Sequence, residues 1–229
     1  MPTPTWSITW DATGERKYET GTDRGVLYEL NSSGAYVNGV AWNGLTAVNE
    51  SPEGAEPTDL WADNIKYATL RSAENFNASI EAYTYPDEFA ECDGSASLAT
   101  GVTIGQQPRK TFGFSYRTLQ GDDVHTDLTY YKLHLVYGCT ASPTEKSYAT
   151  VNDSPSAITF NWSISTVPVN VTGHKATAHL IIDSRTADPT NLAVLEQTLY
   201  GTASDGTNAA VPGSMPLPDA VKAIMTATT

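Results

Sequence analysis

Histidine and cysteine are the side chains of this sequence best suited to bind a transition metal. The chain contains four histidines and two cysteines, Cys92 and Cys139. A zinc site needs three or four ligands at characteristic spacing. His174 and His179 are close in sequence, but no CxxC pair is present, and the alternation of residues around His134 predicts that it lies on the polar face of a strand. The sequence therefore predicts ordinary surface histidines, no metal site and no cofactor.

Three acidic residues between two predicted strands suggest a second kind of site. Asp122, Asp123 and Asp127 are close in sequence, and clustered carboxylates can bind Ca²⁺, which takes about six to eight oxygen ligands. Their spacing does not match an EF-hand loop. The alternative to a metal site is a solvated hairpin tip, at which acids need no ligand.

Paired carboxylates could also perform glycoside hydrolysis. Asp87, Glu88 and Glu91 are the candidates for this chemistry, but acids in the first turn of a helix are better explained by the helix dipole. The chain contains no Gly-x-Ser-x-Gly, phosphate-binding or dinucleotide-binding motif. The residues thus supply no nucleophile, base and orienting group in a recognisable pattern, and we expect no enzyme.

The elements that would position these residues are mainly strands. Apolar and polar residues alternate with period two at 112–117, 131–137 and 160–164, a pattern typical of antiparallel strands with one buried and one polar face. Further strands are expected at 26–30 and 36–40, which form a hairpin, at 41–48 as a continuation, and at 65–70, 78–85 and 176–183. The predicted fold class is mainly β, an antiparallel β-sandwich or half-barrel with a flanking α-helix and extended loops.

Helices are few, and the chain is expected to form one domain. Asp188 can cap a helix over residues 189–200, Pro189 suits its first position, and Gly201 suits its end. Short helices are expected at 86–92 and 218–225. Residues 1–20 are expected to form an N-terminal arm, and residues 21–229 a single domain that includes the C-terminal helix.

Residues 49–63 contain two prolines and several acids, which argue against a central strand and predict a long exposed loop. Loops of this length are commonly functional, so we expect an assembly contact that is disordered when free and ordered on docking. Trp61 is either an aromatic anchor for that contact or the first core residue of the next strand. The candidate contact residues are Glu50, Glu53, Glu56, Asp59 and Trp61.

Composition limits the kinds of partner. The net charge of −13 and the absence of a Lys/Arg run argue against a protein that grips nucleic acid. Leu, Ile, Val and Phe make up less than a fifth of the chain. This low content predicts a small hydrophobic core, which partner subunits would complete. The start lacks a basic, apolar leader, and no run is apolar enough to span a bilayer. We therefore expect synthesis in the cytosol and reduced cysteines.

Long blocks of the chain resemble, in the same order, the major tail (tail tube) proteins of long-tailed siphophages that infect mainly Gram-positive hosts. The resemblance extends over roughly residues 14–225, and its blocks are 15–28, 81–94, 101–118, 131–169, 173–184 and 217–220. It implies that six subunits form a ring with a continuous β-barrel around a lumen, and that stacked rings form the tube through which DNA is ejected. It implies no catalytic residues.

The resemblance also implies partners and a location. The partners would be copies of the chain itself, the tail initiator or tip, the tape measure and the tail terminator, with no membrane. The protein would belong to the virion after synthesis in the host cytoplasm. DNA would pass through the lumen without specific binding. The residues themselves, and not the resemblance, make Asp122, Asp123 and Asp127 the candidates for acids that face the lumen or the next ring, because they lie at a predicted hairpin tip.

Two other functions remain open from the residues. Five tryptophans and twelve tyrosines could form a stacking platform in a monomeric β-sandwich module that binds carbohydrate or a cell surface. A glycosidase-like hydrolase is the third alternative. Size in solution separates the first two, because a binding module stays monomeric whereas a tube protein forms rings or filaments.

Overall fold

The computed structural model describes residues 8–54, 56–125, 127–151, 153, 156–204, 206 and 208–227. Strands account for 45% of the structure and helices for 11%, which confirms a mainly β, antiparallel fold with few helices. The helices are α1 (Phe89–Cys92), α2 (Pro189–Tyr200) and α3 (Pro218–Met225). The strands are β1 (Tyr18–Leu30), β2 (Tyr36–Trp42), β3 (Leu45–Glu50), β4 (Glu53–Gly54), β5 (Pro57–Ala62), β6 (Ile65–Arg71), β7 (Glu74–Asn75), β8 (Asn77–Ala82), β9 (Ala96–Ala99), β10 (Val102–Ile104), β11 (Phe112–Gly121), β12 (Tyr130–Ala141), β13 (Phe160–Thr166) and β14 (His179–Asp183).

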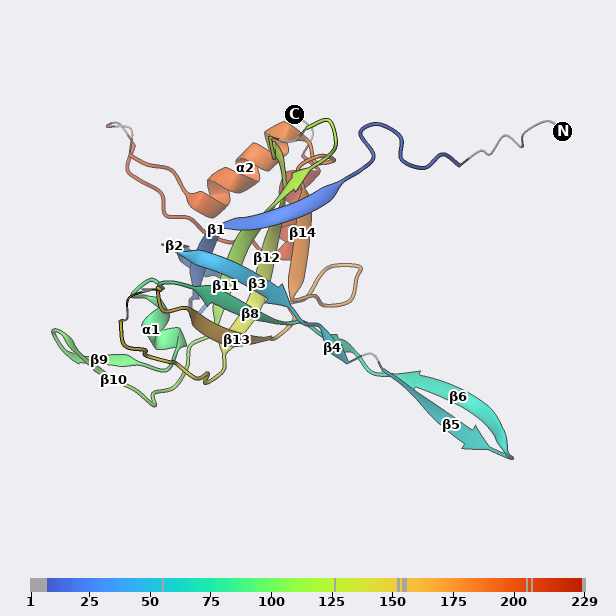
Figure 1. The fold of residues 1–229 in the computed structure, drawn as a ribbon, viewed down its shortest axis with the longest axis horizontal. Coiled ribbons are helices and arrows are strands. Elements are labelled where there is room, and N and C mark those ends of the chain that lie inside the picture. Colours follow the sequence, from blue (N-terminus) through green and yellow to red (C-terminus); the bar gives the residue numbers. More distant parts are fainter. Residues whose placement is uncertain are drawn as a thin grey trace.

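Eight strands form one sheet that folds over into two layers. The strand order is β2-β1-β11-β12-β13-β8-β3, and β14 also pairs with β12. Strand β12 uses residues 132–136 to pair with β14 and residues 139–141 to pair with β13. It therefore belongs to both layers, and Figure 1 shows β3, β8 and β13 crossing β11 and β12.

Gly138 allows β12 to change partner. Its φ is +62°, a conformation that residues with a β carbon rarely adopt. A β carbon at this position would also collide with the backbone of Val167, whose N–H donates a 3.0 Å hydrogen bond to the Gly138 carbonyl. The glycine therefore permits both the conformation and the close approach that join the layers.

Both faces of the central strands are buried, so the expectation of one polar face is wrong for β11 and β12. Ser115 was expected to face water, but it is fully buried, and its hydroxyl lies 3.2 Å from the hydroxyl of Tyr28. The period-two pattern correctly separates the two faces of a strand, but it does not reveal what covers each face. One core cluster includes Trp42, Phe89, Phe112, Phe114, Tyr116 and Trp162, and the other includes Tyr28, Tyr36, Leu133, Leu135, Tyr137, Leu195 and Leu199.

Helices α2 and α3 cover the second cluster. The carboxylate of Asp188 accepts the N–H groups of Thr190 and Asn191 at 2.9 and 3.0 Å, and Pro189 begins α2. Three leucines spaced along α2 face the sheet and are buried. The helices expected at 189–200 and 218–225 are confirmed. A side-chain cap begins α2, whereas α3 begins with Pro218 and has no side-chain cap.

Two expected elements are placed differently. Residues 41–48 do not continue one strand, because β2 ends at Trp42, Gly44 turns the chain with φ +73°, and β3 pairs with β8 in the other layer. The helix expected from Pro86 begins only at Phe89. The N–H of Phe89 donates to the Pro86 carbonyl at 3.0 Å, so the first residues form a turn.

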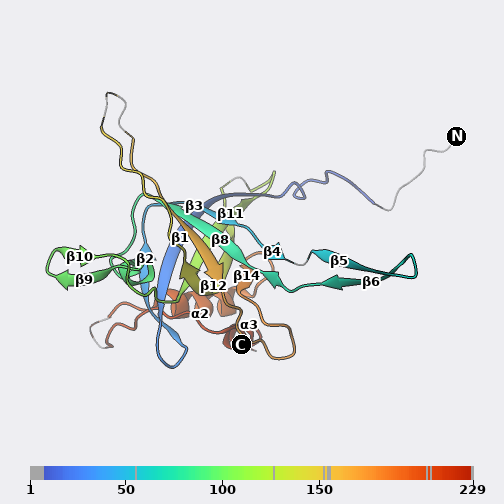
Figure 2. The ribbon, with the colours of Figure 1, turned by 90° about the horizontal axis from the view of Figure 1, so that it is seen from below.

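Several segments extend from the two layers. Figure 1 shows the β5–β6 hairpin and the β9–β10 hairpin projecting on opposite sides, with a third extension leading into β1. Figure 2 shows a further projection between β12 and β13. Strand β1 begins at Tyr18, inside the range expected for the arm. In the described parts of the chain, no helix has the length and apolar character needed to cross a membrane.

The expectation of a loop at residues 49–63 is wrong, because this range contains the strands β4 and β5. Proline is tolerated at the first residue of a strand, and Pro57 occupies that position in β5. Pro52 lies between β3 and β4, outside both. The prolines therefore mark strand boundaries instead of a structureless segment.

Candidate functional site

Strands β5 and β6 form a two-stranded hairpin outside the main sheet. Their antiparallel pairs begin with Pro57 and Arg71 at the base. Asp63 and Asn64 form the turn at the tip, with φ values of 50° and 65°. Two consecutive positive φ values are characteristic of a type I′ turn, whose twist matches that of paired strands and which Asp and Asn tolerate.

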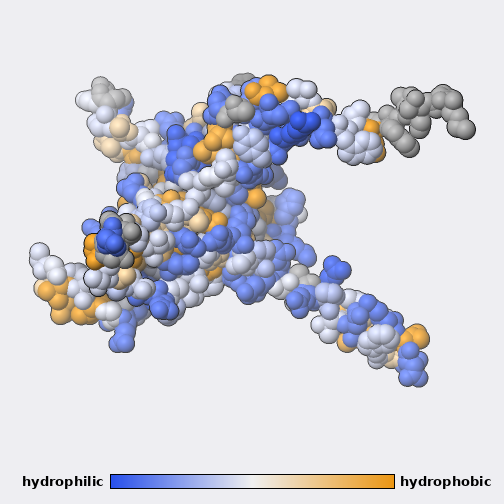
Figure 3. Space-filling model, in the orientation of Figure 1, coloured by the Kyte–Doolittle hydropathy of each residue, from blue (hydrophilic) through white to orange (hydrophobic). Residues whose placement is uncertain are grey.

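The hairpin exposes large apolar side chains. Trp61 is 68% exposed and Tyr67 is 73% exposed, and Leu60, Ile65 and Leu70 are exposed as well. Figure 3 shows apolar surface near the far end of this projection. Of the two interpretations of Trp61, the one that placed it in a strand core is wrong, because it lies on a strand with no core beneath it.

The acids expected in the assembly loop are spread along the hairpin and its base. Glu53 belongs to β4, which pairs with β7, and Glu56 is exposed. Asp59 forms a 2.7 Å ion pair with Lys66, and this contact lowers the pKa of Asp59. Glu50 is separate from the others, because it ends β3 and contacts side chains of the main sheet.

The three acids between β11 and β12 do not form one site. Asp122 is buried, and its carboxylate accepts two backbone N–H groups of the following turn at 2.9 and 2.6 Å. The carboxylate of Asp123 accepts the N–H of Gly14 at 2.9 Å, and Asp127 is exposed. The expected solvated tip is wrong for Asp122, which stabilises the turn. Among the described residues, these acids do not gather at metal-binding distances.

A cluster of ionisable side chains that sequence reasoning missed lies beside the base of the hairpin. Strands β12 and β14 pair so that His134 and His179 share a face on a diagonal, and β3 ends beside them at Glu50. Nδ1 of His134 lies 3.1 Å from Nε2 of His179 and 3.3 Å from Oε1 of Glu50. Nε2 of His179 lies 3.8 Å from the same carboxylate oxygen.

Aromatic rings hold the two imidazoles in place. Tyr116 lies directly opposite His134 in the β11–β12 register. Their rings stack with centroids 4.5 Å apart, and the Tyr116 hydroxyl donates a hydrogen bond to Glu50. Phe76 covers His179 at 4.4 Å. The cluster is therefore built from paired strands, which fix the positions of its side chains.

The surroundings determine the charges of the cluster. The hydrogen bond with His134 lowers the pKa of Glu50 to about 2, so Glu50 is a carboxylate at neutral pH. Burial lowers the pKa of His179 to about 4, so this imidazole is neutral. Burial and the bond to Glu50 raise the pKa of Tyr116, and its hydroxyl therefore stays protonated and donates.

The prediction that His134 lies on a polar strand face is wrong. The residue is only 5% exposed, since β3 and β8 form a second layer over that face. Glu50 and His179 are far from it in the chain, so no spacing rule connects the three. The signal that could have found them is a lone histidine between Leu133 and Leu135, on a strand apolar enough to lie inside the fold.

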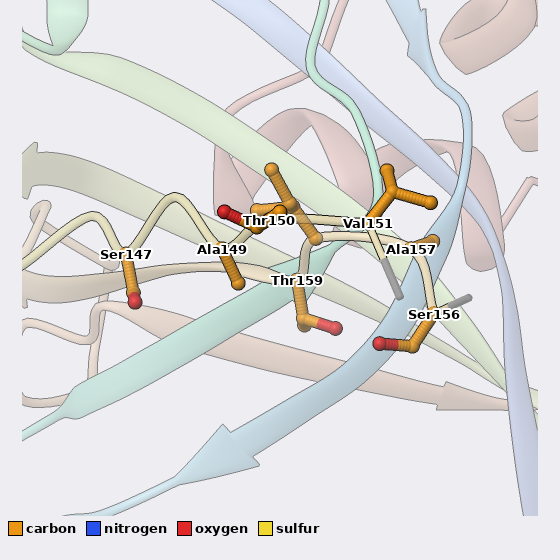
Figure 4. Close-up of a pocket in the computed structure, with 8 residues that line it drawn as sticks. Ser147, Ala149, Thr150, Val151, Ser156, Ala157 and Thr159 are labelled. Carbon is orange, nitrogen blue, oxygen red and sulfur yellow. The ribbon is translucent and has the colours of Figure 1, made fainter. Parts of the chain in front are cut away.

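A hollow lies between the limbs of the segment that joins β12 and β13. Its volume is about 380 Å³, and the described residues that line it are serines, threonines, alanines and aliphatic residues. Figure 4 shows these short side chains along both limbs. No acid, base or thiol lies among the described residues of this lining.

The acids considered for glycoside hydrolysis lie elsewhere. Asp87, Glu88 and Glu91 are all exposed around the start of α1, and Glu91 forms an ion pair with Lys110. The sequence matches no protein-family model, and no curated protein is similar enough to count as a relative.

Proposed function

We propose that this chain is a structural subunit that assembles with copies of itself into stacked hexameric rings, forming the tail tube of a long-tailed phage. The proposal rests on the family resemblance of the sequence blocks, and a mainly β subunit with a flanking helix is compatible with it. The structural observation that carries it is the β5–β6 hairpin, which has apolar side chains and no core of its own.

An isolated two-stranded hairpin is at best marginally stable in water. Trp61 and Tyr67 are largely exposed on it. Full burial of one side chain of the size of Leu or Ile contributes about 1.5–3 kcal/mol, so covering several of them on a neighbouring subunit supplies a large driving force. Exposed apolar side chains gathered on a projecting element favour a protein–protein contact.

The edges of the sheet support the same proposal. In the described part of the chain, β14 pairs only with β12, and β3 pairs only with β8. Exposed strand edges invite pairing with another chain, and closing a sheet into a barrel removes such edges. A ring of subunits that joins these edges would satisfy their free backbone groups.

The charge of the subunit suits a conduit for DNA. Each chain carries a net charge of −13, so a wall built from many copies repels phosphates instead of binding them. Asp123 and Asp127 are the exposed acids of the β11–β12 turn and remain the candidates for the lumen or a ring contact. The proposed partners are further copies of the chain, the tail initiator or tip, the tape measure and the terminator.

The alternative, a monomeric carbohydrate-binding module, draws less support from the aromatic residues. Trp42 and Trp162 are in the core, and they contact each other and Phe89. Four of the twelve tyrosines are buried as well, namely Tyr28, Tyr36, Tyr116 and Tyr137. These side chains maintain the fold and cannot stack on a sugar at the surface.

Replacement of the hairpin tests the proposed function. Strands β4 and β7 close its base by pairing Gly54 with Glu74, so residues 56–72 can be replaced by Asn-Gly while this pairing is kept. Sedimentation over a range of concentrations should show large assemblies for the intact chain and a folded monomer for the variant. Equal assembly of both proteins would refute the role of the hairpin, and a strictly monomeric intact chain would refute the function.

A further inference from the structure

We propose that Glu50, His134 and His179 form a binding site for one divalent transition-metal ion of the Zn²⁺ class. Two imidazole nitrogens and one carboxylate oxygen are a recurrent ligand set for such ions. The three atoms that would bind the ion face one another, and all lie within 4.8 Å. The inference does not depend on self-association.

The spacing of the three atoms suits a tetrahedral ion. Zn²⁺ binds nitrogen and oxygen ligands at about 2.0–2.1 Å, which places neighbouring ligands of a tetrahedron about 3.3 Å apart. The observed separations between Glu50, His134 and His179 are 3.1, 3.3 and 3.8 Å. These atoms therefore already form a triangle close to one face of the coordination tetrahedron.

Neighbouring side chains form hydrogen bonds with two of the proposed ligands, as is usual for metal ligands in proteins. The second ring nitrogen of His134, Nε2, lies 3.1 Å from the hydroxyl of Thr118, and such outer contacts fix the tautomer and orientation of a ligating imidazole. Tyr116 donates to the carboxylate of Glu50. All three ligands come from paired strands, so little ordering is needed when the ion binds.

The site is closed on one side and open on the other. The side chains of His134 and His179 are 6% and 12% exposed, whereas that of Glu50 is 35% exposed. A fourth ligand, such as water, can therefore reach the ion from the side of Glu50. The site also lies beside the base of the hairpin, because Phe76 directly follows β7 and covers His179. A bound ion would thus fasten β3 to β12 and β14 where the hairpin leaves the sheet.

The test uses the full chain without an affinity tag, first stripped with a chelator and then titrated with Co²⁺ and Zn²⁺. We expect one ion per chain, the intense visible absorption of tetrahedral Co²⁺, and loss of that absorption when Zn²⁺ is added. Glu50→Gln, which keeps the shape and the contact with Tyr116, should weaken binding at least tenfold, and His179→Asn should do the same. Thr118→Val should weaken it by about tenfold, as expected for an outer contact.

His174→Asn is the matched control, because His174 is exposed on a turn outside the cluster. Its affinity should equal that of the unchanged protein. Circular dichroism shows whether each variant is folded. Glu50→Gln should disturb folding least, because the side chain of Glu50 is the most accessible of the three ligands. The proposal is overturned if the intact chain binds no Co²⁺ saturably, or if folded Glu50→Gln binds as tightly as the His174→Asn control.

Discussion

Asp63 and Asn64 are consecutive residues with positive φ, and together they set the register of the β5–β6 hairpin. The left-handed conformation costs roughly 1–2 kcal/mol for a residue with a β carbon, less for Asp and Asn. This turn lies at the tip of the hairpin, remote from the core. The tip is therefore the place where the hairpin can be altered without touching the sheet.

We predict opposite effects for two substitutions at Asn64. Asn64→Gly removes the steric cost of the turn and should slow hydrogen exchange of the amides in β5 and β6, whereas Asn64→Val should speed it, because a β-branched residue is poorly tolerated at positive φ. Global unfolding should change by less than about 0.5 kcal/mol in both variants. Equal exchange in both would show that the turn does not determine the order of the hairpin.

The apolar surface of the hairpin is expected to serve assembly and not folding. Trp61→Ser combined with Tyr67→Ser should leave the free energy of unfolding within about 0.5 kcal/mol of the original, since both residues are exposed. The same variant should fail to assemble in light scattering. Tyr148→Ser, at a residue 72% exposed on a different projection, is the comparison for a general loss of surface apolarity. A double variant that assembles normally contradicts the prediction.

Arg117 and Asp23 form a bidentate pair across β1 and β11, with N–O distances of 2.8 and 2.7 Å. Arg117 also lies over the ring of Tyr131, 4.6 Å from its centroid. Lysine cannot reproduce the planar fork, so Arg117→Lys should lower the free energy of unfolding by about 1 kcal/mol, a modest value because the Asp23 side chain is 40% exposed.

Lys66→Ala provides the control for that measurement, because its ion pair with Asp59 is exposed and lies on the hairpin. It should change the free energy of unfolding by less than about 0.5 kcal/mol. Urea unfolding of both variants gives the comparison. A larger effect at Lys66 than at Arg117 would be inconsistent with the described packing.

Leu195 tests how α2 is held to the sheet. It is completely buried in the second cluster, so Leu195→Ala should cost about 2–5 kcal/mol through lost burial and a cavity. Its neighbour Val194 is 46% exposed, and Val194→Ala should cost less than about 0.5 kcal/mol. Thermal unfolding distinguishes the two, and similar losses would indicate that α2 is oriented differently.

Stability should depend on Asp219 in a pH-dependent way. Its carboxylate accepts the hydroxyl and the N–H of Thr172 at 2.6 and 3.0 Å, and these hydrogen bonds lower its pKa below the ordinary 3.8. The folded state therefore holds this proton less tightly than the unfolded chain. The resulting stabilisation is present above about pH 4 and is lost as the pH falls through the lowered pKa.

Asp219→Asn should accordingly be less stable than the original chain at pH 7, and the difference should shrink in strong acid, where the original carboxyl is also neutral. Urea unfolding at several pH values measures this. A difference that stays constant with pH would show that the charge of Asp219 contributes nothing.

Local signals in the sequence predicted the elements that are determined locally. Helix α2 follows from the cap at Asp188, Pro189 and the leucine spacing, and the pattern in β11 correctly separates its two faces. Only the second strand of the β5–β6 hairpin is predicted by the sequence, at residues 65–70. The prolines in residues 49–63 argue against a strand where β5 lies, and an Asp-Asn turn is a weaker hairpin signal than Asn-Gly.

The histidine cluster could not be predicted, because it depends on contacts between distant segments. The alternation around His134 predicts an exposed polar face. The apolar character of the strand suggests a position inside the fold, but it does not reveal that β3 crosses above His134. Glu50 was grouped with the hairpin acids, although it lies in a strand of the main sheet. The reason is local for Asp122, because its own turn folds back on the carboxylate.

Electron microscopy of the purified chain tests the central claim most directly. Negatively stained samples, taken at rising concentration and after long incubation, should contain rings with sixfold symmetry and an open lumen, together with tubes formed by stacking. The variant with residues 56–72 replaced should contain neither. Separate particles of the 24.6 kDa monomer at every concentration would contradict the account.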